Sequence, residues 1–376
     1  MTEFALYIHY PFCLSRCPYC GFATAVEEAG QSTRYREALL KELAHRAAEA
    51  PWQAGRLHSL YLGGGSPSLM PPEYLARLLD EVRRRFQWPA GMEVTIEANP
   101  GTTDLQLFTD FHHAGVNRLS IGAQSFDPAE LELLGRRHTP EDITNALEVA
   151  RRVGFDNISL DILYGIPGQS VASFTSSVRR ALELGIDHLS AYSLSIETGT
   201  PFEGWIKEGK LAPPDPDLAA SQFAELCRWM REAGFEHYEL TNFARPGCWS
   251  RHNFAYWQRS PYLGLGTGAH SFDGRRRFWN PRQTGQYLAR MENGEDPAAG
   301  EEILSTDDAL EELVYLSLRT REGLDIETAY GTFSRDTIDE LLESGFLFQR
   351  NGRLHIPEER WLLLDEIVLR ILEQIP

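Results

Sequence analysis

Three cysteines near the start of the chain have the types and spacing that suggest chemistry. Cys13, Cys17 and Cys20 follow a C-x3-C-x2-C pattern, directly after the β-prone run Phe4–His9. Clustered thiolates bind metals or form disulfides. We expect a cytoplasmic, reducing setting because no signal peptide precedes them. Structural zinc takes four ligands, and no fourth Cys or His follows at zinc-finger spacing. Three cysteines instead suit a [4Fe-4S] cluster with one open iron.

Six short apolar runs in the first half of the chain alternate with segments of helical periodicity. The runs are 5–9, 59–62, 93–97, 118–122, 157–163 and 188–194. Strands that alternate with amphipathic helices form parallel sheets, so the pattern predicts an α/β fold. Six units fall short of the eight in a closed (β/α)8 barrel. We therefore predict an incomplete (β/α)6 barrel over residues 1–243, with a doubly wound sheet as the alternative.

A polar or glycine-rich stretch follows each predicted strand. After the cysteine loop these are Gly63–Pro67, Glu97–Pro100, Gln124, Asp161 and Tyr192–Glu197. Active sites of parallel α/β barrels lie at the carboxyl ends of the strands. We therefore expect these stretches to line one shared pocket, although each polar residue taken alone fits a structural hydrogen bond equally well.

The cysteine pattern, with the aromatic Tyr19 before its last cysteine, resembles the signature of radical S-adenosylmethionine (SAM) proteins. The resemblance implies that the open iron chelates the amino and carboxylate groups of SAM, and that a glycine-rich motif contacts the amino group. Carboxylates suit the ribose hydroxyls, and an arginine suits the methionine carboxylate. The residues that we expect to contact SAM are Tyr7, Tyr19, Gly64, Gly65, Ser66, Glu97, Gln124, Arg136 and Asp161.

Longer motifs narrow the resemblance to the group that contains oxygen-independent coproporphyrinogen III oxidase (HemN) and the heme chaperone HemW. These motifs are Tyr7–Cys13, Gly63–Pro67, Gly115–Phe126 and Asp161–Gln169. HemN has a fourth cysteine where this chain has Phe22, and it has a longer segment before its cluster loop. The H-N-x-x-Y-W motif at His252–Trp257 resembles the HemW branch. The motif and the two differences from HemN all favour the HemW branch.

The resemblance implies a heme chaperone that binds heme near His252 and passes it to an acceptor protein that the sequence does not identify. His237, Cys248 and His270 are further candidates for a heme ligand, because imidazole and thiolate both bind iron. The alternative is a radical SAM enzyme that decarboxylates coproporphyrinogen III. A third possibility is a radical enzyme acting on another tetrapyrrole, or on no tetrapyrrole at all.

The composition of the whole chain limits which partners it can bind. With 36 basic and 54 acidic side chains among 376 residues, the net charge is −18, which disfavours general nucleic-acid binding. The apolar runs are too short for a transmembrane segment. We expect an irregular connecting segment over residues 244–300. Residues 301–376 should form a C-terminal domain of helices and a hairpin at Asn351-Gly352, winged-helix-like but suited to packing or partner contact.

Overall fold

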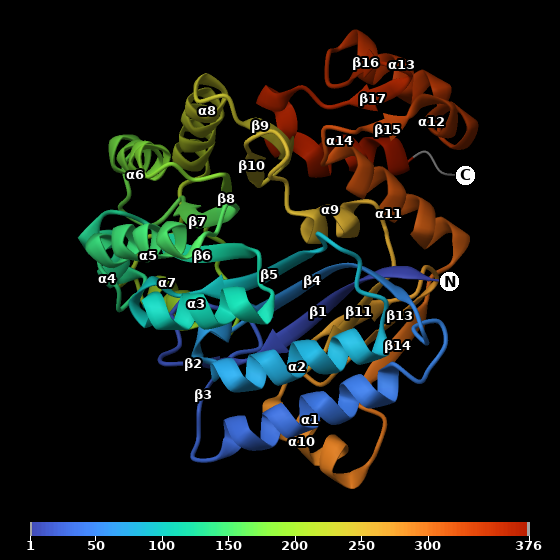
Figure 1. Ribbon diagram of the computed structural model, residues 1–376. Coiled ribbons are helices and arrows are strands. Elements are labelled where there is room, and N and C mark those ends of the chain that lie inside the picture. The colour runs from blue at the N-terminus through green and yellow to red at the C-terminus, as the bar shows by residue number, and fades with distance from the viewer. Residues whose placement is uncertain (1, 374–376) are drawn as a thin grey trace.

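The computed structural model describes residues 2–373 and has a twelve-stranded sheet at its centre (Figure 1). Six parallel strands form the middle of the sheet. They are β1 (Glu3–Tyr10), β4 (Arg56–Gly64), β5 (Glu93–Ala98), β6 (Arg118–Gln124), β7 (Ile158–Tyr164) and β8 (His188–Ser193). Each contains one of the predicted apolar runs to within one residue. The predicted incomplete (β/α)6 barrel is therefore confirmed.

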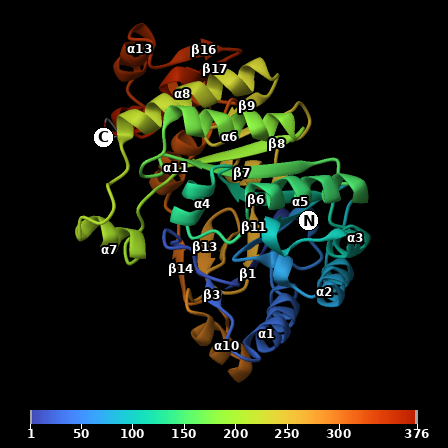
Figure 2. The same cartoon turned by 90° about the vertical axis from the view of Figure 1, so that its left-hand side faces the viewer.

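Amphipathic helices connect these strands and cover the outer face of the sheet (Figures 1 and 2). They are α1 (Gln31–Arg46), α2 (Pro72–Arg85), α3 (Leu105–Ala114), α4 (Pro128–Leu133), α5 (Pro140–Val153) and α6 (Val171–Glu183). Helix α2 shows how the sequence specifies them. Pro72 occupies its first turn, where a missing N–H costs nothing, and the apolar stripe from Tyr74 to Val82 is buried.

Short elements complete the barrel end of the molecule. Strand β2 (Phe12–Cys13) pairs with β3 (Ala25–Val26) around the cysteine loop. The 3-10 turns η1 (Pro67–Leu69) and η2 (Pro100–Thr102) follow β4 and β5. After β8 come α7 (Pro201–Lys207), α8 (Pro216–Glu232), β9 (Glu236–Glu239) and β10 (Asn242–Ala244). Strand β10 pairs antiparallel with β8, and β9 pairs antiparallel with β10 at the edge of the sheet.

Residues 244–300 are not irregular, contrary to our expectation. Helix α9 (Arg251–Trp257) leads to β11 (Tyr262–Leu265), which pairs in parallel with β1. Strands β12 (His270–Phe272), β13 (Arg276–Trp279) and β14 (Gly300–Ile303) continue the sheet antiparallel, with α10 (Thr284–Asn293) inserted between the last two. Strands of three or four residues separated by glycines are too short to show a clear two-residue period.

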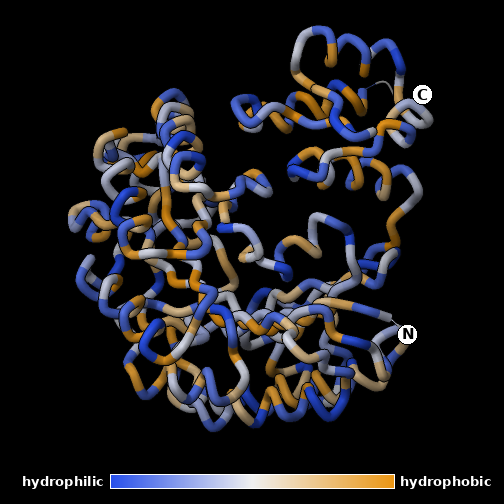
Figure 3. The backbone as a smooth tube through the Cα atoms, turned by 45° about the horizontal axis from the view of Figure 1, so that its top comes forward, coloured by the Kyte–Doolittle hydropathy of each residue, from blue (hydrophilic) through white to orange (hydrophobic). Residues whose placement is uncertain are grey.

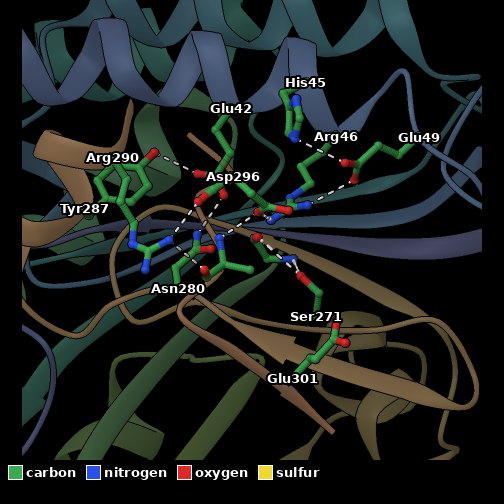
Figure 4. A network of polar contacts seen from close by, with 12 residues as sticks. Glu42, His45, Arg46, Glu49, Ser271, Asn280, Tyr287, Arg290, Asp296 and Glu301 are labelled. Carbon is green, nitrogen blue, oxygen red and sulfur yellow. Dashed lines mark hydrogen bonds and ion pairs between the residues drawn. The ribbon is translucent and has the colours of Figure 1, made fainter. Parts of the chain in front are cut away.

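A buried carboxylate fixes this extension to α1 (Figure 4). Glu42 is fully buried and accepts hydrogen bonds from the Gly266 amide at 2.7 Å, the Asn280 side chain at 2.6 Å and the Tyr287 hydroxyl at 2.7 Å. Arg46, one turn further along α1, pairs with Asp296 at 2.8 Å. Because these acceptors are satisfied by groups 224 or more residues away, the extension belongs to the same packed body as the barrel.

The C-terminal domain has a hydrophobic core of its own. Its elements are α11 (Thr306–Leu318), β15 (Leu324–Asp325), α12 (Ile326–Thr332), α13 (Arg335–Glu343), β16 (Phe348–Arg350), β17 (Arg353–His355), η3 (Glu358–Leu363) and α14 (Leu364–Leu372). Asn351 and Gly352 both have positive φ, at 51° and 74°, as the predicted hairpin turn requires. Figure 3 shows hydrophobic and hydrophilic residues alternating along these helices. The winged-helix-like arrangement agrees with the prediction.

Across residues 2–373, no helix has the length and apolar character needed to cross a bilayer. The cytoplasmic location and the domain boundaries stay predictions.

Candidate functional site

A cavity of about 1050 Å³ opens at the carboxyl ends of the parallel strands. It is lined by side chains or backbone from each of the six strand ends. The predicted residues that line it are Tyr7, Cys13, Cys17, Tyr19, Cys20, Gly64, Gly65, Ser66, Glu97, Gln124, Arg136 and Asp161. The structure thus brings every predicted cluster and SAM residue to one place, and it leaves out His252.

The three cysteines are free, partly buried thiols on one wall of this cavity. A backbone turn from the Cys20 amide to the Cys17 carbonyl, 3.1 Å long, holds the loop closed. Burial raises the pKa of the Cys13 thiol to about 11, so this thiol needs a bound cation to ionise. The Arg136 guanidinium supplies one positive charge that favours the Cys13 thiolate, and its Nη1 lies 3.7 Å from Sγ of the neighbouring Cys17. Three thiols on one cavity wall fit the donor set of a cluster.

The glycine loop after β4 lies against the start of the cysteine loop. The amides of Gly65 and Ser66 donate to the carbonyls of Tyr10 and Phe12, at 2.8 and 2.9 Å. A Cβ on Gly65 would lie 2.5 Å from the backbone oxygen of Pro11, and Gly64 has φ +115°. Neither position tolerates a side chain, so the loop leaves bare backbone facing the cavity.

Two carboxylates occupy the cavity interior. Glu97 accepts from the Tyr61 hydroxyl at 3.0 Å and the Gly64 amide at 2.9 Å. Burial, reinforced by the charge of Asp161, raises the pKa of Glu97 to about 7. Burial also raises the pKa of Asp161, although the Ser120 hydroxyl donates to it at 3.0 Å. Perturbed carboxyls inside a cavity are typical of binding and catalytic sites.

Gln124 stands at the end of β6 in a conformation that few residues adopt. Its φ is +66°, and the pairing with β7 shifts register between Gly122 and Gln124. A positive φ outside glycine carries strain that persists where the surroundings impose it, often at functional sites. Arg136 donates to the Gly122 carbonyl at 2.8 Å, so it lies beside this bulge as well as beside the cysteines.

Several cavity residues were not predicted. His9 Nε2 lies 3.0 Å from the Ala23 carbonyl and its Nδ1 lies 3.0 Å from the Tyr7 hydroxyl. Burial lowers the pKa of His9 to about 4, so the neutral ring donates from Nε2 and accepts from Tyr7 at Nδ1. The signal was available, because residues 7 and 9 share one face of a strand. Arg118 also lines the cavity, is only 2% exposed, and its Nε has no hydrogen-bond partner among residues 2–373.

His252 lies behind the cavity wall. It is 1% exposed, and its two ring nitrogens lie 3.0 Å from the Ser59 hydroxyl and 2.9 Å from the Tyr256 hydroxyl. Burial lowers the pKa of His252 to about 3, so the ring is neutral. Both nitrogens are occupied, and neither is free to bind iron in this conformation. The same motif reaches the cavity through Asn253 and Tyr256 instead.

Comparison with known proteins identifies the family. Residues 7–181 match the radical SAM superfamily, and residues 304–363 match the HemN C-terminal domain. The chain is 38% identical over 372 residues to the heme chaperone HemW of Mycobacterium tuberculosis (strain H37Rv), covering 98% of this chain and 95% of that protein. The chain belongs to the HemW family of radical SAM proteins.

Further relatives of this HemW family member show the same extent of similarity. It is 36% identical over 398 residues to the mouse mitochondrial radical S-adenosyl methionine domain-containing protein 1, covering all of this chain and 88% of that one. The solved structure of Escherichia coli coproporphyrinogen III oxidase (HemN) superimposes with a TM-score of 0.85 at 26% identity, covering 98% of this chain and 90% of that one. The radical SAM domain implies a [4Fe-4S] cluster and SAM.

Proposed function

We propose that this protein is a heme chaperone that binds a [4Fe-4S] cluster, SAM and heme, and transfers the heme to an acceptor protein. The proposal rests on the similarity to the M. tuberculosis heme chaperone HemW, which extends over nearly the whole chain. The single cavity at the strand ends supports it, because its volume of about 1050 Å³ exceeds what one small ligand fills.

In the proposal, Cys13, Cys17 and Cys20 hold the cluster at one end of the cavity. A bound cluster would supply an electron to SAM at its open iron. The backbone of Gly64 and Gly65 would accept and orient the methionine end of SAM, with Ser66 beside it. These assignments draw on the bare backbone there and on the free thiols.

The remaining SAM contacts come from the cavity interior and from the side of the cysteine loop. Arg136 would bind the methionine carboxylate, since its guanidinium lies beside Cys17. Glu97 and Asp161 would accept from the ribose hydroxyls or the amino group, and Gln124 would donate and accept. Tyr7 and Tyr19 would enclose the adenine, because both line the cavity.

We assign the heme ligand to His270 instead of His252. His270 is exposed at the cavity, whereas both nitrogens of His252 are occupied. Desolvation by the surrounding cavity walls, together with the charge of Arg277, lowers the pKa of His270 although the residue is solvent-accessible, so its imidazole is neutral and able to bind iron near neutral pH. Its ring stacks on Trp279 with centroids 5.8 Å apart. Phe22, 71% exposed at the same cavity, offers an apolar face to a porphyrin.

A hemin titration of the cluster-reconstituted protein tests this assignment. His270→Ala should weaken hemin binding by at least about tenfold, because an axial ligand is lost, while His45→Ala, an exposed histidine on α1, should leave it unchanged. Transfer is then followed by mixing the hemin-loaded protein with an apo b-type cytochrome and recording the cytochrome spectrum. Equal hemin affinity in both variants would refute the ligand assignment.

Decarboxylation of coproporphyrinogen III is the second candidate, favoured by the superposition on HemN along 98% of the chain. Phe22 stands where HemN has its fourth cysteine, which argues against it. Product analysis with SAM and a reductant separates the two functions: protoporphyrinogen formed over many turnovers would establish the oxidase.

A further inference from the structure

Three side chains whose types can bind a metal ion converge at the junction between the barrel and the C-terminal domain. They are Cys227 on α8, His237 on β9 and Glu358 at the start of η3. One ligand atom from each lies within 4.8 Å of the other two. Cys227 Sγ is 3.9 Å from His237 Nδ1, and Glu358 Oε1 is 2.9 Å from the same nitrogen. This group lies outside the cavity that holds the predicted SAM and cluster residues.

These separations are close to those that one tetrahedral zinc ion imposes. With Zn–S at about 2.3 Å and Zn–N and Zn–O at about 2.0 Å, tetrahedral angles place sulfur about 3.6 Å from nitrogen and nitrogen about 3.3 Å from oxygen. The observed 3.9 and 2.9 Å differ from these by a few tenths of an ångström. The third separation, between Cys227 Sγ and the Glu358 carboxylate, lies within 4.8 Å, and binding one zinc ion would draw these two atoms to about 3.5 Å.

The hydrogen bonds of His237 orient the ring as a metal ligand requires. Its Nε2 lies 3.2 Å from the Leu240 carbonyl, which accepts only, so Nε2 carries the proton. The lone pair of Nδ1 then points toward the carboxylate and the thiol. Metal-binding histidines commonly donate their second N–H to a backbone carbonyl in this way. Arg231 pairs with the other oxygen of Glu358, which leaves Oε1 directed at His237.

The surroundings hold the histidine in place and leave one side open. The ring stacks on Phe243 with centroids 3.9 Å apart and meets the edge of Trp361 at 4.2 Å. Cys227 is 6% exposed, whereas the Glu358 side chain is 26% exposed and borders a cavity of about 610 Å³. That cavity provides an entry path and room for a water as fourth ligand.

We propose that Cys227, His237 and Glu358 bind one divalent metal ion of the zinc class, which ties the C-terminal domain to the barrel. Binding replaces the thiol proton of Cys227, released to solvent, with a sulfur–metal bond. Without metal, a proton on Nδ1 would instead make an imidazolium–carboxylate pair, with the thiol uninvolved. The two arrangements differ in whether Cys227 matters, and this difference makes the proposal testable.

Cobalt(II) titration of the full-length chain distinguishes the two arrangements. The parent carries Cys13→Ala, Cys17→Ala and Cys20→Ala so that the cluster loop does not compete for metal. We expect one equivalent of cobalt, with a sulfur-to-cobalt charge-transfer band and the d–d bands of a four-coordinate site. Cys227→Ser should weaken binding by more than about tenfold and abolish the charge-transfer band. The matched control Cys248→Ser, a half-buried thiol elsewhere, should change neither.

A second variant and a second readout guard against misfolding. Glu358→Gln changes a partly exposed side chain and keeps its volume, so this variant should fold, which circular dichroism will check. It should bind cobalt more weakly than the parent, because a carboxylate ligand is replaced by an amide. Zinc should raise the thermal unfolding midpoint of the parent and of Cys248→Ser, but not that of Cys227→Ser. No cobalt bound by the folded parent, or equal binding after Cys227→Ser, would overturn the proposal in favour of the imidazolium–carboxylate pair.

Discussion

Glu97 gives the most quantitative prediction for the proposed SAM site. Burial and the charge of Asp161 raise the pKa of Glu97 to about 7, so this carboxyl titrates in the physiological range. In the proposed site it accepts hydrogen bonds from SAM, while the Tyr61 hydroxyl and the Gly64 amide donate to it from the protein side. Protonation removes its charge and one acceptor, so the affinity for SAM should rise with pH.

The size of the effect follows from the pKa. With a pKa of about 7, about one molecule in eleven carries ionised Glu97 at about pH 6, and about ten in eleven do at about pH 8. If the ionised form alone binds SAM well, the association constant rises about tenfold across this interval, or about 1.4 kcal/mol. Asp161→Asn removes the neighbouring charge and should move the midpoint to lower pH.

Isothermal titration of SAM into cluster-reconstituted protein at several pH values measures this dependence. Glu97→Gln keeps the shape of the side chain and cannot ionise, so the comparison removes the pH dependence that belongs to SAM itself. Between about pH 6 and about pH 8, we expect the association constant of the wild type to rise by about tenfold more than that of Glu97→Gln. Parallel curves for the two proteins would refute the role of Glu97 in binding SAM.

Three further changes have distinct expected outcomes. Gly65→Ala places a Cβ 2.5 Å from the Pro11 carbonyl oxygen and should weaken SAM binding by about 1–3 kcal/mol, measured as a loss of affinity of at least about fivefold. Gly204→Ala, with open space around it, should leave SAM affinity unchanged. Glu42→Ala should lower the free energy of unfolding by about 3 kcal/mol in urea titrations, because three buried donors lose their acceptor; an unchanged midpoint would contradict this. His252→Ala should destabilise by about 2–4 kcal/mol in the same assay yet keep hemin binding, and a loss of hemin binding in the folded variant would restore its ligand role.

The barrel could be predicted because its strands carry a local signal. Strands such as β4 and β7 are buried along nearly their whole length, and both are rich in Leu, Ile and Tyr, with glycine at or just after the carboxyl end. Helix α2 repeats its apolar stripe at helical spacing. The carboxyl ends of parallel strands meet at one edge, so a pocket that collects the strand-end residues follows from topology alone.

The extension over residues 244–300 depends on contacts that no local pattern shows. Strand β11 pairs with β1 across more than 250 residues of sequence, and Glu42 accepts hydrogen bonds from donors 224 to 245 residues away. His252 illustrates the same limit for function. Its residue type suits iron, but burial and its two hydroxyl partners arise from tertiary packing. Residue type predicted that a histidine could bind iron, and the fold determined which histidines, His9 and His270, line the cavity.

Porphyrin product analysis tests the central claim most directly. The cluster-reconstituted protein is loaded with hemin, then supplied with SAM, a reductant, coproporphyrinogen III and an apo b-type cytochrome, and both the porphyrins and the cytochrome spectrum are recorded. A heme chaperone should deliver heme to the cytochrome and leave coproporphyrinogen III unconverted. Catalytic conversion to protoporphyrinogen IX without heme delivery would contradict the account.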